Sequence, residues 1–445
     1  MASKLWEKSY STETRIEEFT VGNDAQLDMA LAPYDVQGSL AHIEMLESIN
    51  LLEKDELKVL QIELKNIYKE ILDGDFVIED GVEDIHSQVE MLLTQRLGDV
   101  GKKIHSGRSR NDQVLVDLKL YIRAELKETV QQTKQLFDKF TQLSEKFKDV
   151  YIPGYTHLQV AMPSSFGLWF GAYAESLADD MNMLLAAYRI SNKNPLGSAA
   201  GYGSSFPLDR QLTTDLLGFD DINYNAVYAQ MSRGKTEKLV SMALASVAGT
   251  LSRMAMDVCL YMSQNFGFLT FPKELTTGSS IMPHKKNPDV FEIMRGKCNR
   301  IAALPNEITM MTTNLPSGYH REMQLIKEGF FPAFNTINEC MEMAEFMFDQ
   351  MIVTENLLDD EKYKYVFSVE VVNDLVLKGV PFRDAYKQVG EDIENNTFEP
   401  LREINHSHEG SIGNLALDKI TASINKTLDE FKFNVTEAAI EKLLN

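Results

Sequence analysis

Cysteine, basic charge and long apolar runs are all scarce in this chain of 445 residues. Its 3 cysteines, Cys259, Cys298 and Cys340, have neither a metal nor a redox spacing, so a reducing cytoplasm is the simplest setting. Lysine and arginine number 44 against 66 aspartate and glutamate residues, and the net charge of −22 argues against nucleic acid or an anionic membrane as a partner. An anionic substrate would need a local basic pocket.

No apolar stretch approaches the ~20 residues of a membrane span, and residues 1–7 lack the apolar core of a signal peptide. The longest candidate, residues 239–250, is too short and is more typical of a core helix. A hydrophobic fraction of 44% with 25% charged residues is ordinary for a soluble globular protein. We therefore expect a globular protein with a large buried core and no membrane span.

Helical periodicity is abundant. Apolar residues recur at helical spacing from Gly107 to Pro153, which predicts one helix of about 60 Å between about 109 and 148. Similar apolar runs predict four more long helices, at 163–190, 235–266, 289–311 and 322–351. Pro305 and Pro332 should kink or interrupt the last two. Strand-like alternation is scarce, so the predicted fold class is all-α.

The five long helices predict a central domain at 107–356, with smaller helical domains at 1–106 and 357–445. Several methionines on these helices are expected to fill gaps in the core and at interfaces: Met181, Met183, Met242, Met254, Met256, Met341, Met343 and Met347. Helices this apolar on several faces would expose too much surface in a monomer. We therefore expect a homo-oligomer.

Residues 277–289, TGSSIMPHKKNPD, combine a glycine, hydroxyls, two lysines and two prolines between apolar helical segments. Asn287 can cap a helix, Pro288 suits the first helical position and Asp289 suits the positive end of the helix dipole. Lys285 and Lys286 beside a helix N-terminus would favour an anion. This composition indicates a catalytic or binding loop more than a simple connector.

The segment GSSIMPHKKNPD resembles the signature loop of the aspartase/fumarase superfamily, whose members eliminate fumarate from a substituted succinate. Further stretches resemble the argininosuccinate lyase family: DVQGS (35–39), EDIH (83–86), GRSRNDQ (107–113), GYTHLQ (154–159) and KGVPFR (378–383). The resemblance extends over nearly the whole chain. It implies a tetramer whose central helices merge into one bundle, with each active site built from three subunits.

The resemblance also implies roles for individual residues. Ser279 matches the base that removes a proton next to a carboxylate, and Lys285 and Asn287 match residues that hold the doubly charged carboxylate. His157 and Glu292 match a proton-transfer pair. Further positions match residues that contact substrate or lie beside the site: His86, Arg110, Asn111, Thr156, Tyr319, Gln324 and Lys327. Of these, residues 319, 324 and 327 match the pattern that recognises the arginine half of argininosuccinate.

The chain also departs from the family pattern. The acidic neighbours usual around Arg233 are missing from residues 231–234, MSRG. The substrate-binding serine common near the N-terminus has no assigned counterpart at residues 21–24, VGND. No metal or organic cofactor is expected, and His406 and His408 are more typical of a solvated loop than of a metal site. The alternatives are another fumarate-releasing enzyme, such as adenylosuccinate lyase, or a non-enzymatic relative of the crystallin kind.

Overall fold

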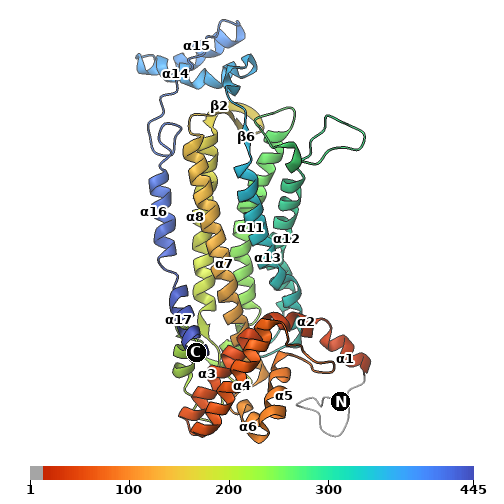
Figure 1. The fold of residues 1–445 in the computed structure, drawn as a ribbon. Helices are drawn as coiled ribbons and strands as arrows, with labels where there is room; N and C mark the ends of the chain where they lie inside the picture. Colours follow the sequence, from red (N-terminus) through yellow and green to blue (C-terminus); the bar gives the residue numbers. More distant parts are fainter. Residues whose placement is uncertain (1–13) are drawn as a thin grey trace.

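A computed structural model describes residues 14–445, which form a long bundle with a group of shorter helices at each end (Figure 1). The helices at the N-terminal end are α1 (Thr14–Val21), α2 (Asp24–Asp28), α3 (Ala32–Ser48), α4 (Lys54–Asp73), α5 (Ile85–Leu97) and α6 (Asp99–Lys102). They enclose an apolar core of their own, which includes Val36, Leu40, Leu64, Ile67 and Leu93. The loops between these helices and the start of the bundle form one end of the molecule.

The bundle consists of five long helices that lie side by side (Figure 1). They are α7 (Arg110–Lys146), α8 (Phe166–Ser191), α11 (Lys235–Met262), α12 (Asp289–Thr312) and α13 (Ile326–Asp349), with the short α9 (Arg210–Leu216) and α10 (Ala226–Met231) between α8 and α11. Their shared core is rich in aromatic rings, among them Phe140, Phe170, Phe291, Phe330 and Phe334. The prediction of five long helices and an all-α class is confirmed.

α7 begins where the sequence supplies a strong start signal. Ser109 caps the helix, and Ser109 and Asp112 form a reciprocal capping box. Asp112 also accepts hydrogen bonds from the backbone N–H groups of Gly197 and Ala199 at 3.0 and 2.8 Å. Burial raises the pKa of Asp112 to about 6 even against these hydrogen bonds. The start of α7 is thereby attached to the loop that follows α8.

Pro305 and Pro332 were predicted to kink or interrupt their helices; they do not interrupt them, because α12 and α13 continue through both positions, and the kink stays a prediction. In each helix a threonine one turn later donates its hydroxyl to the proline carbonyl, Thr309 to Pro305 at 2.6 Å and Thr336 to Pro332 at 2.8 Å. Packing in the bundle core outweighs the one backbone hydrogen bond that each proline removes. α12 therefore spans the full distance between the loops at its two ends.

Beyond the bundle, α14 (Ser368–Leu377) and α15 (Phe382–Glu394) form the group opposite the N-terminal end (Figure 1). α16 (Leu417–Leu428) then returns along α8, and α17 (Phe433–Leu444) packs on α3 and α9. The domain boundaries at 106 and 356 stay a prediction. The short strands are β1 (Tyr151–Thr156), β2 (Gln159–Ser165), β3 (Lys193–Asn194), β4 (Asp221–Ile222), β5 (Leu269–Thr270) and β6 (Ile352–Val353).

α11 is the one described helix that is long and apolar enough to cross a membrane by length and composition alone. Its apolar side chains are instead core residues: Val240, Leu244, Val247 and Leu251 are all 0% exposed. This agrees with the expectation of a core helix at 239–250. Met181, Met254, Met341 and Met347 are buried in the core, as predicted, whereas Met183, Met242, Met256 and Met343 are exposed, and their place at an interface stays a prediction.

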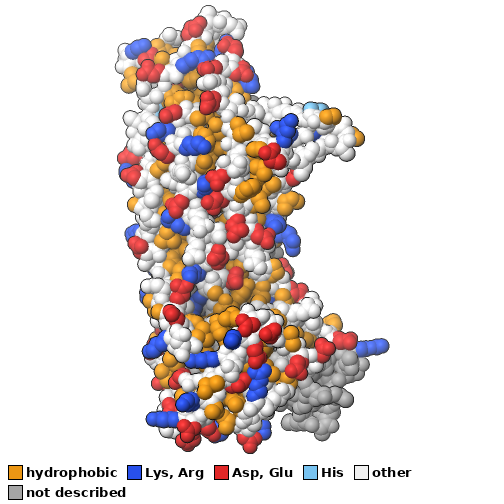
Figure 2. Space-filling view, viewed as in Figure 1, with side chains coloured by type: hydrophobic (Ala, Val, Ile, Leu, Met, Phe, Trp, Pro, Cys, Tyr) orange, Lys and Arg blue, Asp and Glu red, His pale blue; other side chains and the backbone are white. Residues whose placement is uncertain are grey.

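Apolar side chains also remain on the surface along much of the bundle (Figure 2). On α12 and α13, Ile293 is 63% exposed and Phe346 49% exposed, and both line an open groove of about 620 Å³ between these helices. An apolar groove of this size on a helical bundle is typical of a protein interface. The surface therefore suits association of the bundle with further helices.

Candidate functional site

A cavity of about 140 Å³ lies where the N-terminal helices meet the bundle, and we call it the lower cavity. It is lined by side chains from α2, from the segment before α5, from the start of α7 and from the segment that leads into α13. The predicted residues His86, Arg110, Asn111, Tyr319, Gln324 and Lys327 all line it. The structure thus brings together six side chains from positions up to 241 residues apart in the sequence.

Arg110 is oriented by three groups before α5 and at its start. Its Nη1 lies 2.8 Å from Glu83 and 3.2 Å from Asp84, and its Nη2 donates to Ser87 Oγ at 2.7 Å. Burial opposes ionisation of Asp84, but the positive charges of His86 and Arg110 outweigh it and lower the pKa of Asp84. The acidic segment 83–84 therefore positions Arg110 at the cavity wall.

His86 faces two buried carboxylates. Its Nδ1 lies 2.7 Å from Asp35 and 3.5 Å from Asp117. Burial disfavours the imidazolium, but the hydrogen bond and charge of Asp35 outweigh burial and raise the pKa of His86 to about 9. Within residues 14–445 these three side chains are the only group of three that could hold a metal ion. The hydrogen bond from His86 to Asp35 makes these side chains a buried ion pair.

Lys327 is 3% exposed and contacts both Asp24 and Asp28 at 2.5 Å. Gln324 donates to the backbone carbonyl of Thr20 at 2.8 Å, and Tyr319 is 39% exposed at the cavity mouth. The three residues predicted to recognise one half of the substrate therefore lie in one wall. Sequence reasoning assigned no role to Asp24 or Asp28, because nothing in the sequence indicated that α2 packs on α13.

Arg233 lacks the acidic sequence neighbours that are usual in the family, but it forms an ion pair with Glu237, one helical turn later. Its Nε lies 2.9 Å from Glu237 Oε1, and both side chains are 3% exposed. Its Nη2 donates to the carbonyl of Met323 at 3.2 Å. The departure at residues 231–234 therefore leaves the arginine paired and fixed against the segment that carries Gln324.

At the other end of the bundle, His157 occupies the tip of the hairpin formed by β1 and β2. His157 and Leu158 are the two loop residues, with φ of 52° and 57°. Two successive left-handed residues match the twist that two-residue hairpin loops require, although neither residue is a usual choice there. Thr156, His157 and Leu158 are exposed, so the hairpin presents its tip to the surroundings of the chain.

The signature loop lies at the same end, before α12. Ser279 is half-buried, and its Oγ accepts hydrogen bonds from the backbone N–H groups of Ile281 and Met282 at 3.3 and 3.0 Å. Lys285 is exposed, and its backbone N–H donates to the carbonyl of Met282 at 3.1 Å. The loop is held mainly by its own backbone contacts, which leaves the Lys285 ammonium outside them.

The expectation that Asn287 caps α12 is wrong. The helix begins at Asp289 with Pro288 in the cap position, and no side chain caps it. Asn287 instead closes the loop, because its backbone N–H donates to the Thr277 carbonyl at 2.9 Å and its Nδ2 donates to Thr277 Oγ1 at 3.2 Å and the Gly278 carbonyl at 3.4 Å. The hydrogen bonds to Thr277 and Gly278 therefore occupy the Asn287 side chain, which does not cap the helix.

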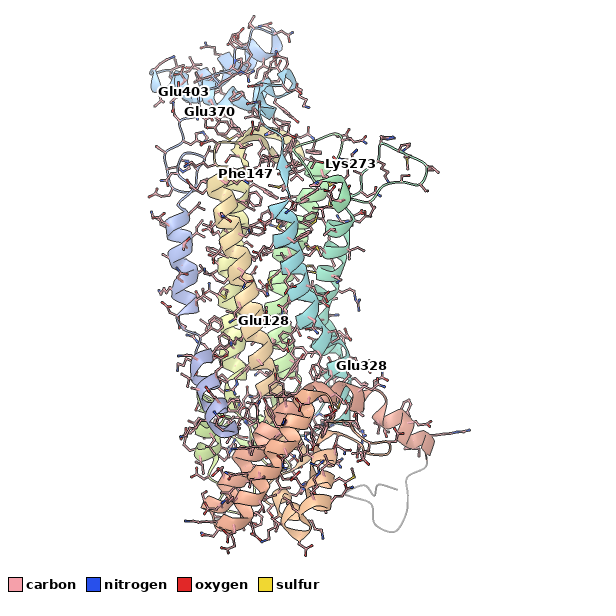
Figure 3. The ribbon with its side chains drawn as sticks, viewed as in Figure 1. Glu128, Phe147, Lys273, Glu328, Glu370 and Glu403 are labelled. Carbon is pink, nitrogen blue, oxygen red and sulfur yellow. The ribbon has the colours of Figure 1, made fainter. Side chains whose placement is uncertain are left out.

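The predicted partners His157 and Glu292 are both exposed, and no hydrogen bond joins them in the part of the chain that the structure describes. The two ends of the bundle are also far apart. The 24 residues of α12 extend for about 36 Å and the 37 residues of α7 for about 55 Å. In Figure 3, Lys273 near the signature loop and Glu328 beside Lys327 lie at opposite ends of the bundle. One chain therefore does not bring its two groups of predicted site residues together.

Comparisons with known proteins agree in sequence and in fold. A family model described as Lyase matches residues 7–303. The argininosuccinate lyase of Phocaeicola vulgatus is 61% identical over 444 residues, covering 100% of both chains. That of Thermotoga neapolitana is 38% identical over 391 residues, covering 88% of this chain and 98% of the relative.

Solved structures share the fold at low identity. An EDDS lyase in complex with formate has a TM-score of 0.76 at 21% identity, covering 98% of this chain and 95% of the other. A class II fumarase from Schistosoma mansoni has a TM-score of 0.70 at 15% identity, covering 95% of this chain and 96% of the other. At such identity the likeness concerns the helical architecture alone.

Proposed function

The chain belongs to the argininosuccinate lyase family, and on that premise we propose that it cleaves argininosuccinate into arginine and fumarate in arginine biosynthesis. The observation that carries this function is the identity of about 60% over the whole chain with argininosuccinate lyases of several organisms. The reaction removes a proton from the carbon next to a carboxylate and then breaks the neighbouring C–N bond. It needs a base, an acid and a positively charged contact for the carboxylate.

In this proposal Ser279 is the base. A serine hydroxyl is a poor base in water, so the loop must close over the substrate and the Lys285 ammonium must favour the alkoxide. Lys285 and Asn287 then hold the carboxylate that gains a second negative charge. Two backbone N–H groups already donate hydrogen bonds to Ser279 Oγ, and the same donors would stabilise a negative charge on this oxygen.

His157 and Glu292 form the second proton-transfer group. The carboxylate favours one tautomer of the imidazole, which leaves the other ring nitrogen to transfer the proton. Thr156 contacts the substrate from the same hairpin. Both side chains are exposed on their own chain and so are accessible to a partner, and in this proposal the pair forms between the hairpin of one subunit and α12 of another.

The lower cavity binds the rest of the substrate. Arg110 and Asn111 contact substrate carboxylates, and His86 lies beside them as a positive charge. Tyr319, Gln324 and Lys327 recognise the arginine half. A superfamily member that eliminates fumarate from malate or aspartate has no arginine moiety to hold, so this wall favours argininosuccinate.

The working enzyme is a homotetramer with shared active sites. The two groups of site residues lie at opposite ends of α12, about 36 Å apart, so the ends of neighbouring bundles must meet to complete a site. The apolar groove with Ile293 and Phe346 supplies the surface for such packing. The enzyme acts in the cytoplasm and uses no metal or organic cofactor.

The test is a steady-state assay of the purified protein that follows fumarate by its ultraviolet absorbance. Argininosuccinate, adenylosuccinate, malate and aspartate are supplied in parallel. Fumarate from argininosuccinate alone is the expected result. Fumarate from adenylosuccinate would move the chain to another branch of the superfamily, and no fumarate from any substrate would favour a non-enzymatic relative.

A further inference from the structure

Asp24 lines the lower cavity but has no role in the reaction described above. Asp24 and Asp28 lie at the two ends of α2, four residues apart, and side chains at this spacing share one helix face. Both carboxylates contact Lys327 Nζ at 2.5 Å. α2 therefore presents two carboxylates to one buried ammonium group.

The two carboxylates differ in how far they are already bonded. Asp28 is 3% exposed, accepts a hydrogen bond from Lys327 through Oδ1 and accepts one from the backbone N–H of Ile85 through Oδ2 at 3.4 Å. Asp24 is 17% exposed, its Oδ1 contacts Lys327, and no other donor from residues 14–445 reaches its carboxylate. Asp28 thus fixes Lys327, whereas Asp24 retains the capacity to accept another donor.

The charges at this wall are also unequal. Three arginines also line the cavity, and each forms an ion pair with a glutamate: Arg110, Arg233 and Arg321. Lys327 therefore offers one positive charge to two carboxylates. Burial, together with the negative charge of Asp28, raises the pKa of Asp24 against the opposing effect of Lys327. A second cation beside Asp24 would neutralise the excess negative charge.

We propose that Asp24 binds the α-ammonium group of the arginine half of argininosuccinate, beside Lys327, which binds the α-carboxylate. This inference rests on the function proposed above. Both charged groups of an amino-acid head are attached to one carbon, so their receptor needs opposite charges in contact, as Asp24 and Lys327 are. The cavity of about 140 Å³ exceeds several-fold the roughly 30 Å³ that one water occupies, so it has room for such a head group.

This pairing makes Asp24 a determinant of specificity. The excess negative charge on α2 attracts a ligand that carries an ammonium next to its carboxylate. A ligand with a carboxylate but no ammonium would have to displace Asp24 from Lys327, and the displaced Asp24 carboxylate would then have no cation beside it. The cavity therefore selects a leaving group with an intact α-amino acid head.

Isothermal titration with three ligands tests this role. L-arginine has both head-group charges, agmatine lacks the carboxylate and Nα-acetyl-L-arginine lacks the ammonium. Each is titrated into the wild type, Asp24→Asn and Asp24→Ser, with Asp80→Asn as a control that removes an exposed carboxylate outside the cavity lining. Native mass and melting temperature confirm that each variant folds.

We expect Asp24→Asn to weaken arginine and agmatine binding by about 10- to 100-fold, as for loss of a charged hydrogen bond, and to leave Nα-acetyl-L-arginine binding unchanged. Asp80→Asn should change none of the three. Equal weakening of all three ligands would assign Asp24 to the guanidinium or to cavity shape, and unchanged arginine binding would remove it from the site; either result overturns the inference. Turnover of argininosuccinate by the wild type is measured separately, so a failure of the proposed function is distinguished from a failure of this role.

Discussion

Mixing two impaired variants, assayed at a substrate concentration below the KM of the Asn111→Ala variant, tests whether the active site is shared between subunits. Asn111→Ala changes the lower cavity at the start of α7, and Ser279→Ala changes the signature loop at the far end of α12. Losing the Asn111 amide should cost about 1.5–3 kcal/mol of substrate binding, or roughly 10-fold or more. Losing the base should cost at least ~10²-fold in kcat.

The expected recovery follows from the geometry. The Asn111→Ala subunit still has an intact signature loop, and the Ser279→Ala subunit still has an intact lower cavity. If each site takes residue 111 from one subunit and residue 279 from another, a site is native when its loop comes from the first variant and its cavity from the second. In a 1:1 mixture each condition is met about half the time, so about a quarter of the sites are native. Coexpressed variants should therefore recover about a quarter of wild-type activity in the fumarate assay.

A matched control uses two variants of the same loop. Ser279→Ala and Lys285→Ala both change residues 277–289, so no mixture of them yields a loop that is intact at both positions. This pair should stay at the level of the separate variants. If the pair from opposite ends of α12 also stays at that level while the oligomer mass equals that of the wild type, the active site is not shared between subunits.

Three further predictions concern single changes. Ser279→Ala should lower kcat at least ~10²-fold while light scattering still gives the wild-type oligomer mass, and near-normal turnover would exclude Ser279 as the base. The pKa of His86 is about 9 in the folded protein and about 6.5 in the unfolded chain, so protonated His86 contributes about 3 kcal/mol to the free energy of unfolding below pH 6.5, and this contribution is lost as the pH rises through 9. Urea unfolding between pH 6.5 and 9.5 should therefore show a free energy of unfolding that falls with pH. His86→Gln should reduce this fall, whereas the half-exposed control His105→Gln should not. Phe346→Glu, which places a charge in the groove between α12 and α13, should reduce the mass in light scattering, and an unchanged mass would exclude that groove as an interface.

The bundle could be predicted from the sequence because long helices repeat their apolar positions every three to four residues. The boundaries of α7 were also readable, since Ser109 and Asp112 form a recognisable cap. The hairpin was not predicted, because its loop residues His157 and Leu158 lack the glycine or asparagine that marks such turns. Local rules fail where contacts distant in the sequence decide the structure.

Contacts with other segments overrode the local signal at two further positions. Asn287 satisfies every local condition for a helix cap, yet a partner ten residues earlier, Thr277, takes its side chain. Asp24 looks like the acidic first turn of a short helix, yet it contacts Lys327, which lies 303 residues later. Motif resemblance found Lys327 because it matches the family pattern, but it assigned no contact to residues 21–24 and so did not find Asp24.

The two groups of proposed site residues lie at opposite ends of the bundle, so packing of its apolar surface against other subunits would be needed for catalysis. A rigid helix such as α12 keeps the signature loop and the lower cavity about 36 Å apart, so no loop movement within one chain can close that distance. In the proposed function, association supplies the missing half of each site, and the exposed Ile293 and Phe346 lie on the helices that would mediate it. Any change that weakens this packing should therefore lower activity in proportion to the tetramer lost, even where it contacts no substrate.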